Sequence, residues 1–163
     1  MFIKRLVFIV TACTTLWAAQ PVMAASGLPV PRFVSIKATE ANTRTGPSVR
    51  YPVMWVYQKK GLPVEIVAEF EQWRKIRDKD GDEGWIHESL LSGNRSVFLT
   101  GGKDHIIYRL PETSALPLMR AQSGVMASLV TCKEEWCRIF LNGEKGWIER
   151  KYLWGIYPEE TFE

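Results

Sequence analysis

The chain has 163 residues and carries 21 Lys and Arg against 18 Asp and Glu, which gives a net charge of +3 at pH 7. Apolar residues make up 46% and aromatic residues 12% of the sequence, a composition that excludes a disordered chain. No apolar run of about 18 residues follows the N-terminus, so a protein with several membrane spans is excluded. With two histidines and no glycine-rich phosphate loop, most catalytic and nucleotide-binding arrangements are excluded as well.

The first 24 residues have the three-part pattern of a secretory signal peptide. Lys4 and Arg5 precede an apolar stretch over residues 6–19, and Val22-Met23-Ala24 places small residues at the −3 and −1 positions of a cut after Ala24. We therefore expect an exported, periplasmic protein whose mature chain begins at residue 25. A lipoprotein box ending at Cys13 is the alternative, but the apolar stretch before that cysteine is very short.

Cleavage after residue 24 changes the charge of the chain. It leaves 163 − 24 = 139 residues and removes two positive charges, so the net charge falls from +3 to +1. A nearly neutral protein has no general electrostatic attraction to nucleic acid. The sequence thus predicts no nucleic-acid partner, and no membrane span in the mature chain.

The mature chain contains two copies of one unit. Residues 61–73 run from Gly to Trp, and so do residues 124–136, at an offset of 63. Gly84-Trp85-Ile86 returns as Gly146-Trp147-Ile148 at an offset of 62, so one residue is lost in the intervening turn. The repeat predicts two domains, residues 35–95 and 96–157, between an N-terminal linker of residues 25–34 and an acidic tail of residues 158–163.

In chain order, each copy has the pattern of short β-strands. Residues 64–71 alternate, with Val64, Ile66, Ala68 and Phe70 expected on one face. Residues 73–77 and 84–87 follow as strands joined by an Asp80-Gly81 turn. Residues 95–100 connect the copies, and the second copy repeats the pattern over residues 125–133, 135–141 and 146–149. No stretch of ten residues has helical periodicity, so the expected fold is all-β.

Cys132 and Cys137 are the two cysteines of the mature chain, and they flank a predicted hairpin turn. At the repeat offset they align with Glu69 and Arg74, an oppositely charged pair of the kind found across neighbouring strands. Two positions whose side chains are close enough for an ion pair can also be close enough for a disulfide, and an oxidising compartment favours that bond. We expect a structural disulfide. Two independent thiols are the alternative, while a metal site lacks a complete ligand set.

The first copy resembles the bacterial SH3-like domain. The resemblance rests on Ala41-Asn42-Thr43-Arg44-Thr45-Gly46-Pro47, Tyr51-Pro52, Gly61-Leu62-Pro63-Val64, Trp73-x-x-Ile76 and Gly84-Trp85-Ile86, in this order. It covers residues 35–91 well and residues 103–153 more weakly, where Tyr108-Arg109-Leu110-Pro111 lacks the glycine. It implies two tandem small SH3-like β-barrels of the type exported by Gram-negative bacteria. It also implies peptide-type ligands, such as the peptide stems of peptidoglycan.

The aromatic residues specific to the first copy are the best binding candidates. Tyr51, Trp55 and Tyr57 follow the long loop, and Trp55 and Tyr57 are expected to share one face. With Asn42 and Arg44 they predict a shallow ligand-binding groove. The alternative is that these aromatics pack between the two domains. Four tryptophans that recur in both copies are assigned a packing role instead: Trp73, Trp85, Trp136 and Trp147.

Neither histidine stands in a catalytic arrangement. His87 comes after a predicted inward-facing residue at a strand end, and His105 stands at a strand start. A Cys–His hydrolase needs a free activated thiol, whereas both thiols are expected to be bonded. The acidic residues between 78 and 83 form a solvated turn without the rest of a calcium loop. We expect an exported, non-catalytic binding module without cofactor or metal. The alternatives are an adaptor for another envelope protein and a cell-wall-modifying enzyme.

Overall fold

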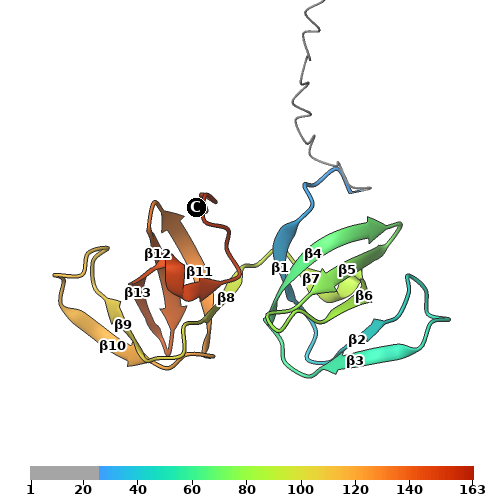
Figure 1. Ribbon diagram of the computed structural model, residues 1–163, viewed down its shortest axis with the longest axis horizontal. Coiled ribbons are helices and arrows are strands. Elements are labelled where there is room, and N and C mark those ends of the chain that lie inside the picture. The colour runs from blue at the N-terminus through green and yellow to red at the C-terminus, as the bar shows by residue number, and fades with distance from the viewer. Residues whose placement is uncertain (1–25) are drawn as a thin grey trace, which may run out of the picture.

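The computed structural model describes residues 26–163, so the predicted signal peptide and Cys13 lie outside the described residues. Over this range the chain forms two seven-stranded sheets and two single turns of 3-10 helix (Figure 1). The two sheets repeat the same order of elements, which confirms the all-β, tandem architecture. None of the helical segments described is long and apolar enough to cross a membrane.

The first sheet, which we call domain 1, has the strand order β3-β2-β6-β5-β4-β1-β7. Its elements are β1 (Arg32–Ile36), β2 (Ala41–Arg44), β3 (Val53–Tyr57), β4 (Pro63–Phe70), β5 (Trp73–Arg77), β6 (Glu83–His87), η1 (Glu88–Leu90) and β7 (Leu91–Ser92).

The second sheet, domain 2, has the order β10-β9-β13-β12-β11-β8-β14. Its elements are β8 (Ser96–Leu99), β9 (His105–Tyr108), β10 (Pro117–Ala121), β11 (Met126–Lys133), β12 (Trp136–Leu141), β13 (Glu144–Glu149), η2 (Arg150–Tyr152) and β14 (Leu153–Trp154).

Neither sheet closes into a barrel, which corrects the expectation of closed SH3-like barrels. In domain 1 the end strands β3 and β7 share no ladder within residues 26–163. The hairpin of β2 and β3 stands away from the rest of the domain as a wing, because β2 joins β6 through one residue pair, Arg44 with Trp85 (Figure 1). The contact is close there: a Cβ added to Gly84 would lie 2.8 Å from the Thr43 Cβ.

A β-bulge lies at the same place in both domains and redirects the side chains beyond it. In β4 the register shifts between Ile66 and Ala68, after which the Glu69 side chain points inward and Phe70 is 50% exposed. The predicted alternation, which put Phe70 on the face of Ile66, is wrong for this reason. The equivalent shift in β11 turns Cys132 into the core of domain 2.

Each domain has its own small aliphatic core. The fully buried members of the first core include Ile36, Val64, Ile76 and Ile86, from four different strands. The second core is larger, and it includes the buried cysteines as well as the aliphatic residues of β8, β9, β11, β12 and β13. Cores of this size bury little surface for each residue ordered, so cross-links and packing between the domains carry more of the stability.

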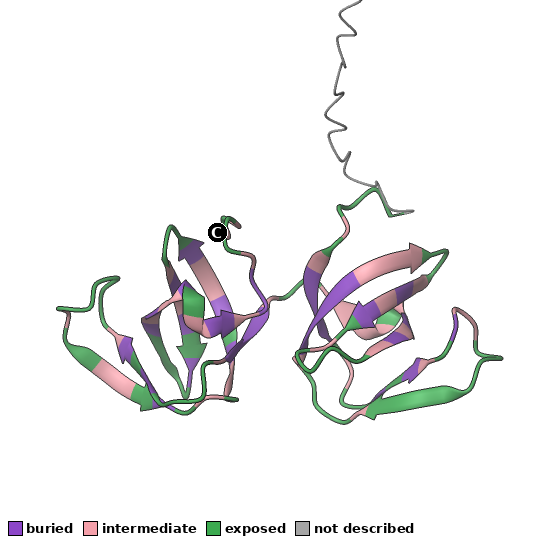
Figure 2. Ribbon diagram, in the orientation of Figure 1, coloured by how far each residue is buried: buried purple, intermediate pink, exposed green. Residues whose placement is uncertain are grey.

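The domains meet where β1 packs against β14 and where β4 approaches β8, and Figure 2 colours β1 and β8 mostly as buried. Phe33 packs edge-to-face on Trp154, with ring centroids 5.2 Å apart, and also against Tyr157 at 4.7 Å. The Tyr157 hydroxyl donates a hydrogen bond of 2.7 Å to Glu65 of domain 1. These contacts place the last strand of domain 2 against the first strand of domain 1.

Candidate functional site

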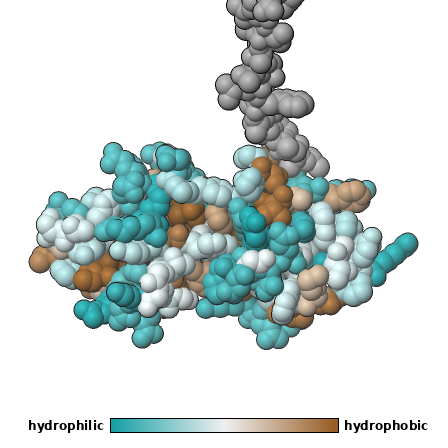
Figure 3. All heavy atoms as spheres, viewed as in Figure 1, coloured by the Kyte–Doolittle hydropathy of each residue, from teal (hydrophilic) through white to brown (hydrophobic). Residues whose placement is uncertain are grey.

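The outer strand of the wing, β3, is the most exposed apolar segment of domain 1. Residues 53–56 are each 45–48% exposed. Within the part of the chain described, β3 pairs only with β2, so one of its backbone edges is free. Figure 3 shows apolar side chains along the lower edge of domain 1, where Figure 1 places β3. A free strand edge bordered by apolar side chains can accept an extended peptide.

The loop that precedes β3 is closed by Tyr51 and Arg44. The Tyr51 ring covers Gly46 so closely that an added Cβ there would lie 2.7 Å from three ring atoms. Arg44 Nη1 donates a hydrogen bond of 2.7 Å to the Tyr51 carbonyl oxygen. The arginine and the glycine of the Asn-x-Arg-x-Gly-Pro segment therefore hold Tyr51 beside the wing, half-exposed.

The cross-strand register settles which candidate residues share a face. Trp55 lies opposite Thr43 and Tyr57 lies opposite Ala41, so Trp55 and Tyr57 occupy the same face of the wing. Asn42 stands between Ala41 and Thr43 and so points to the opposite face. The structure brings Trp55 and Tyr57 together and Arg44 and Tyr51 together, but it does not gather all five candidates on one face.

Tyr57 anchors the wing, while Trp55 is left exposed. The Tyr57 hydroxyl donates a hydrogen bond of 3.0 Å to Asp78 Oδ2, and its ring packs against the core of domain 1. Burial raises the pKa of the Tyr57 hydroxyl well above its ordinary value, and the hydrogen bond to Asp78 adds to the rise. Tyr57 is thus neutral and fixed, which leaves Trp55 as the exposed aromatic side chain on this face of the wing.

The domain junction uses a different set of aromatic residues from the wing. Phe33, Trp154 and Tyr157 make its contacts, as described above. Four strands of the sheet separate β1, which carries Phe33, from β3, which carries Trp55. Packing between the domains, the alternative role considered for the wing aromatics, therefore does not apply to Trp55.

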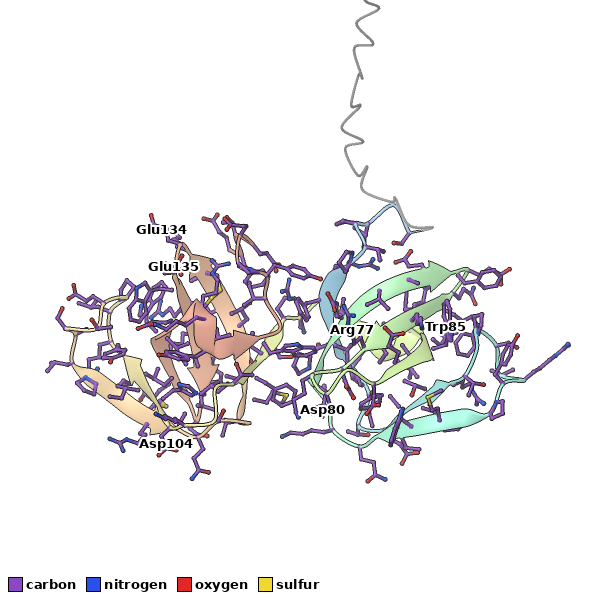
Figure 4. The ribbon with its side chains drawn as sticks, in the orientation of Figure 1. Arg77, Asp80, Trp85, Asp104, Glu134 and Glu135 are labelled. Atoms are coloured by element: carbon purple, nitrogen blue, oxygen red, sulfur yellow. A yellow bond between two sulfur atoms is a disulfide. The ribbon has the colours of Figure 1, made fainter. Side chains whose placement is uncertain are left out.

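Trp85, for which the repeat predicts a packing role, lies half-buried on the outer face of domain 1 and outside its aliphatic core. The residues on either side of it, Gly84 and Ile86, are buried, and alternation turns the indole outward. Its register partners in the two adjacent strands are Arg44 on β2 and Lys75 on β5. Figure 4 shows Trp85 on the side of domain 1 that faces away from domain 2. The Lys75 ammonium is paired with Glu83, so the half-buried indole and the neighbouring Arg44 form the second surface suited to a ligand.

Domain 2 repeats this outer face with different neighbours. Trp147 occupies the position of Trp85, and its register partners are Tyr108 and Arg138. Tyr108 therefore stands where domain 1 has Arg44, and it packs edge-to-face on Trp136 with centroids 5.8 Å apart. The recurring tryptophans are half-buried in both domains and belong to neither core.

Comparison with known proteins places this chain in a family. A family model of the bacterial SH3 domain matches residues 37–93 and again residues 102–155. The chain belongs to the bacterial SH3 domain family. Both matches fall on the domains described above, so each sheet is one bacterial SH3 domain.

Individual relatives are more distant. The chain is 25% identical over 128 residues to the putative N-acetylmuramoyl-L-alanine amidase YrvJ of Bacillus subtilis, covering 72% of this chain and 24% of that protein. It thus spans about a quarter of that relative's length. Two solved structures show weaker likeness. NlpC2 of Trichomonas vaginalis is 12% identical with a TM-score of 0.37, and the match covers 81% of this chain and 51% of that one. An NlpC/P60 family protein of Bacillus cereus is 15% identical with a TM-score of 0.34, and the match covers 74% of this chain and 55% of that one.

The two bacterial SH3 domains hold the β4–β5 hairpin and its copy by different means. Cys132 and Cys137 face each other across β11 and β12 and form a disulfide, which confirms the predicted bond. At the same place in domain 1, Glu69 lies 3.2 Å from Arg74 Nε and 2.6 Å from Arg32 Nη2. Both arginines and the carboxylate are largely buried, so the group forms an electrostatic cross-link where domain 2 has a covalent one.

The histidines of the bacterial SH3 domains are engaged in local packing. His87 Nδ1 lies 2.8 Å from Ser89 Oγ and its Nε2 lies 3.3 Å from Gln72 Oε1. His105 is buried and packs against the Tyr152 ring in a tilted arrangement, with ring centroids 4.6 Å apart. No group of three or more His, Cys, Asp or Glu side chains within residues 26–163 is placed to hold a metal ion.

Proposed function

We propose that this protein binds peptide components of the bacterial cell wall through the wing of domain 1. The observation that carries the proposal is the free edge of β3, bordered by the exposed indole of Trp55. Membership of the bacterial SH3 domain family supports it. So does the likeness to a putative N-acetylmuramoyl-L-alanine amidase, a name that refers to a linkage between a sugar and a peptide.

The mechanism follows from the geometry of the wing. An extended peptide adds to β3 through main-chain hydrogen bonds, and the Trp55 indole covers its side chains. Arg44 and Tyr51 shape the loop at one end of the strand, where the partly exposed guanidinium can meet a ligand carboxylate. The surface is small and open, so the affinity for a single peptide is modest.

We further propose that the protein is exported and acts without catalysis. The signal-like N-terminus supports export, and the Cys132–Cys137 disulfide is typical of an oxidising compartment. Absence of catalysis is supported by the engagement of Cys132 and Cys137, the two cysteines of residues 26–163, in that bond, and by the contacts of both His87 ring nitrogens with Ser89 and Gln72, since a Cys–His hydrolase needs a free thiol and an available base.

Co-sedimentation with purified peptidoglycan sacculi tests the binding proposal. We expect the wild-type protein to sediment, and Trp55→Ala to lose affinity about fivefold or more, as removal of a central aromatic contact does. Phe70→Ala is the matched control, because Phe70 is an equally exposed aromatic residue on β4 of the same domain. If the wild-type protein stays in solution, the cell-wall proposal falls, and cross-linking for an envelope protein partner follows. If Trp55→Ala sediments like the wild type, the wing is not the site.

A further inference from the structure

A cleft of about 320 Å³ lies where the two domains meet, away from the wing. Its walls come from β1, the turn that precedes β4 and the end of β7 in domain 1, from the connection between the domains, and from β8 and β11 of domain 2. The Ser96 hydroxyl donates a hydrogen bond of 2.5 Å to the Gly61 carbonyl oxygen and so fixes one domain against the other at the cleft. The polar residues that line it are Ser35, Lys37, Lys60, Ser92, Asn94, Arg95, Ser96 and Ser128.

The lining of the cleft carries positive charge and no carboxylate. Within residues 26–163, no Asp or Glu side chain forms an ion pair with Lys37 or Lys60. Arg95 adds little net charge, because Glu160 accepts two hydrogen bonds from its guanidinium at 2.5 and 3.1 Å. Lys37 and Lys60 are thus the two uncompensated cations of the lining, and serine hydroxyls and the Asn94 amide lie beside them, with Ile36 and Gly61 as the apolar part. Cations next to hydrogen-bond donors suit an oxyanion.

The two lysines are specific to the domain junction and are not a requirement of the fold. The Gly61 N–H donates to the Ile36 carbonyl oxygen, and in domain 2 the Gly124 N–H donates to the Leu99 carbonyl oxygen in the same way. Lys60, which precedes Gly61, therefore corresponds to Ser123. Lys37, which follows Ile36, corresponds to Thr100. Both residues of domain 2 are uncharged, and the Ser123 hydroxyl lies 3.4 Å from the Leu99 carbonyl oxygen that it can donate to. Only the copy of this site that faces the other domain has acquired a pair of cations.

We propose that this cleft binds the oxyanion of a small ligand, a carboxylate or a phosphate group, between the ammonium groups of Lys37 and Lys60. The hydroxyls of Ser92 and Ser128 and the amide of Asn94 donate the remaining hydrogen bonds. Because the walls come from both domains, the bound anion also ties domain 1 to domain 2. The site shares no residue with the wing and does not depend on the function proposed above.

Titration of the purified protein, followed by ¹⁵N–¹H NMR at constant ionic strength, tests the proposal. The probes are acetyl-alanine, its uncharged methyl amide, inorganic phosphate and sodium chloride. We expect saturable shifts of the Lys60, Asn94 and Ser128 amides. Saturation by acetyl-alanine but not by its methyl amide identifies a peptide carboxylate as the ligand group, and saturation by phosphate alone identifies a phosphate group. Shifts that fail to saturate, or that sodium chloride reproduces, overturn the proposal.

Charge-removing variants complete the test. Lys37→Gln with Lys60→Gln should weaken binding about tenfold or more, because both ammonium groups contact the anion. Lys59→Gln is the matched control, since Lys59 is the adjacent exposed lysine and does not line the cleft. If the double variant binds the probe as tightly as the wild type does, the cleft is not the site. Dispersed amide signals from β4 and β11 in the double variant show that it is folded.

Discussion

Reduction of the Cys132–Cys137 disulfide should destabilise domain 2 and leave domain 1 unchanged. The bond joins residues only five positions apart, and the chain-entropy relation gives about 2 kcal/mol at 25 °C for a loop this short. That free energy corresponds to about a thirtyfold change in the unfolding equilibrium. A thiol reductant has no effect on the Glu69–Arg74 ion pair at the same place in domain 1, so the domains should respond differently.

Native-state hydrogen exchange measures both domains in one sample. Ile139 of β12 and Ile76 of β5 occupy the same repeat position, and both are fully buried. We expect the Ile139 amide to exchange about thirtyfold faster after reduction and the Ile76 amide to exchange at its former rate. The double variant Cys132→Ala, Cys137→Ala is the control, because a reductant must leave its amide exchange rates unchanged. A change of less than about threefold at Ile139 would refute the entropic reasoning.

Four further predictions concern other parts of the chain. Gly84→Ala should lower the free energy of unfolding by about 1–3 kcal/mol, because the new Cβ would lie 2.8 Å from Thr43; an unchanged urea midpoint would show that β2 can move away from β6. Tyr157→Phe should cost about 1 kcal/mol in the same assay by removing the 2.7 Å hydrogen bond to Glu65, and no loss would mean that the aromatic contacts alone hold the junction. Burial acts to raise the pKa of Glu69, but hydrogen bonds from Ser26 and Arg32 outweigh it and lower that pKa below 4.5. Its stabilising effect is therefore present above pH 4.5 and lost as the pH falls through the lowered value, and Glu69→Gln should flatten the unfolding free energy over that range. Mass spectrometry of the exported protein should find residue 25 at its N-terminus, and retention of residues 1–24 would contradict the predicted signal peptide.

The internal repeat is what makes the disulfide predictable from the amino-acid sequence. Its alignment places Cys132 and Cys137 on Glu69 and Arg74, and all four side chains do meet across their hairpins. The same alignment does not reveal the bulge, because Val67, the residue at the shift of register, lies between the apolar residues Ile66 and Ala68 and leaves no mark in the pattern. The alternation therefore predicts Phe70 on the wrong face.

The outer aromatic face is harder to predict, although the sequence holds a signal for it. Recurrence of Trp85 in both copies favours a packing role, yet the buried neighbours Gly84 and Ile86 require the indole to point outward. The exposure of β3 has no such signal, because nothing in its own sequence says that it ends a sheet. The contacts of Phe33 with Trp154 depend on how two domains dock, which alternation within a strand does not encode.

The fixed junction has a consequence for ligands that repeat. Trp85 and Trp147 mark two outer faces whose spacing is set by the packing of Phe33, Trp154 and Tyr157 rather than by a flexible tether. If one face held one unit of a repeating ligand, the other face would meet a high effective concentration of further units only where they lay at the matching distance. A chain whose two faces both bound a repeating unit would therefore discriminate between an ordered polymer and its soluble fragments, even where each face alone bound both equally well.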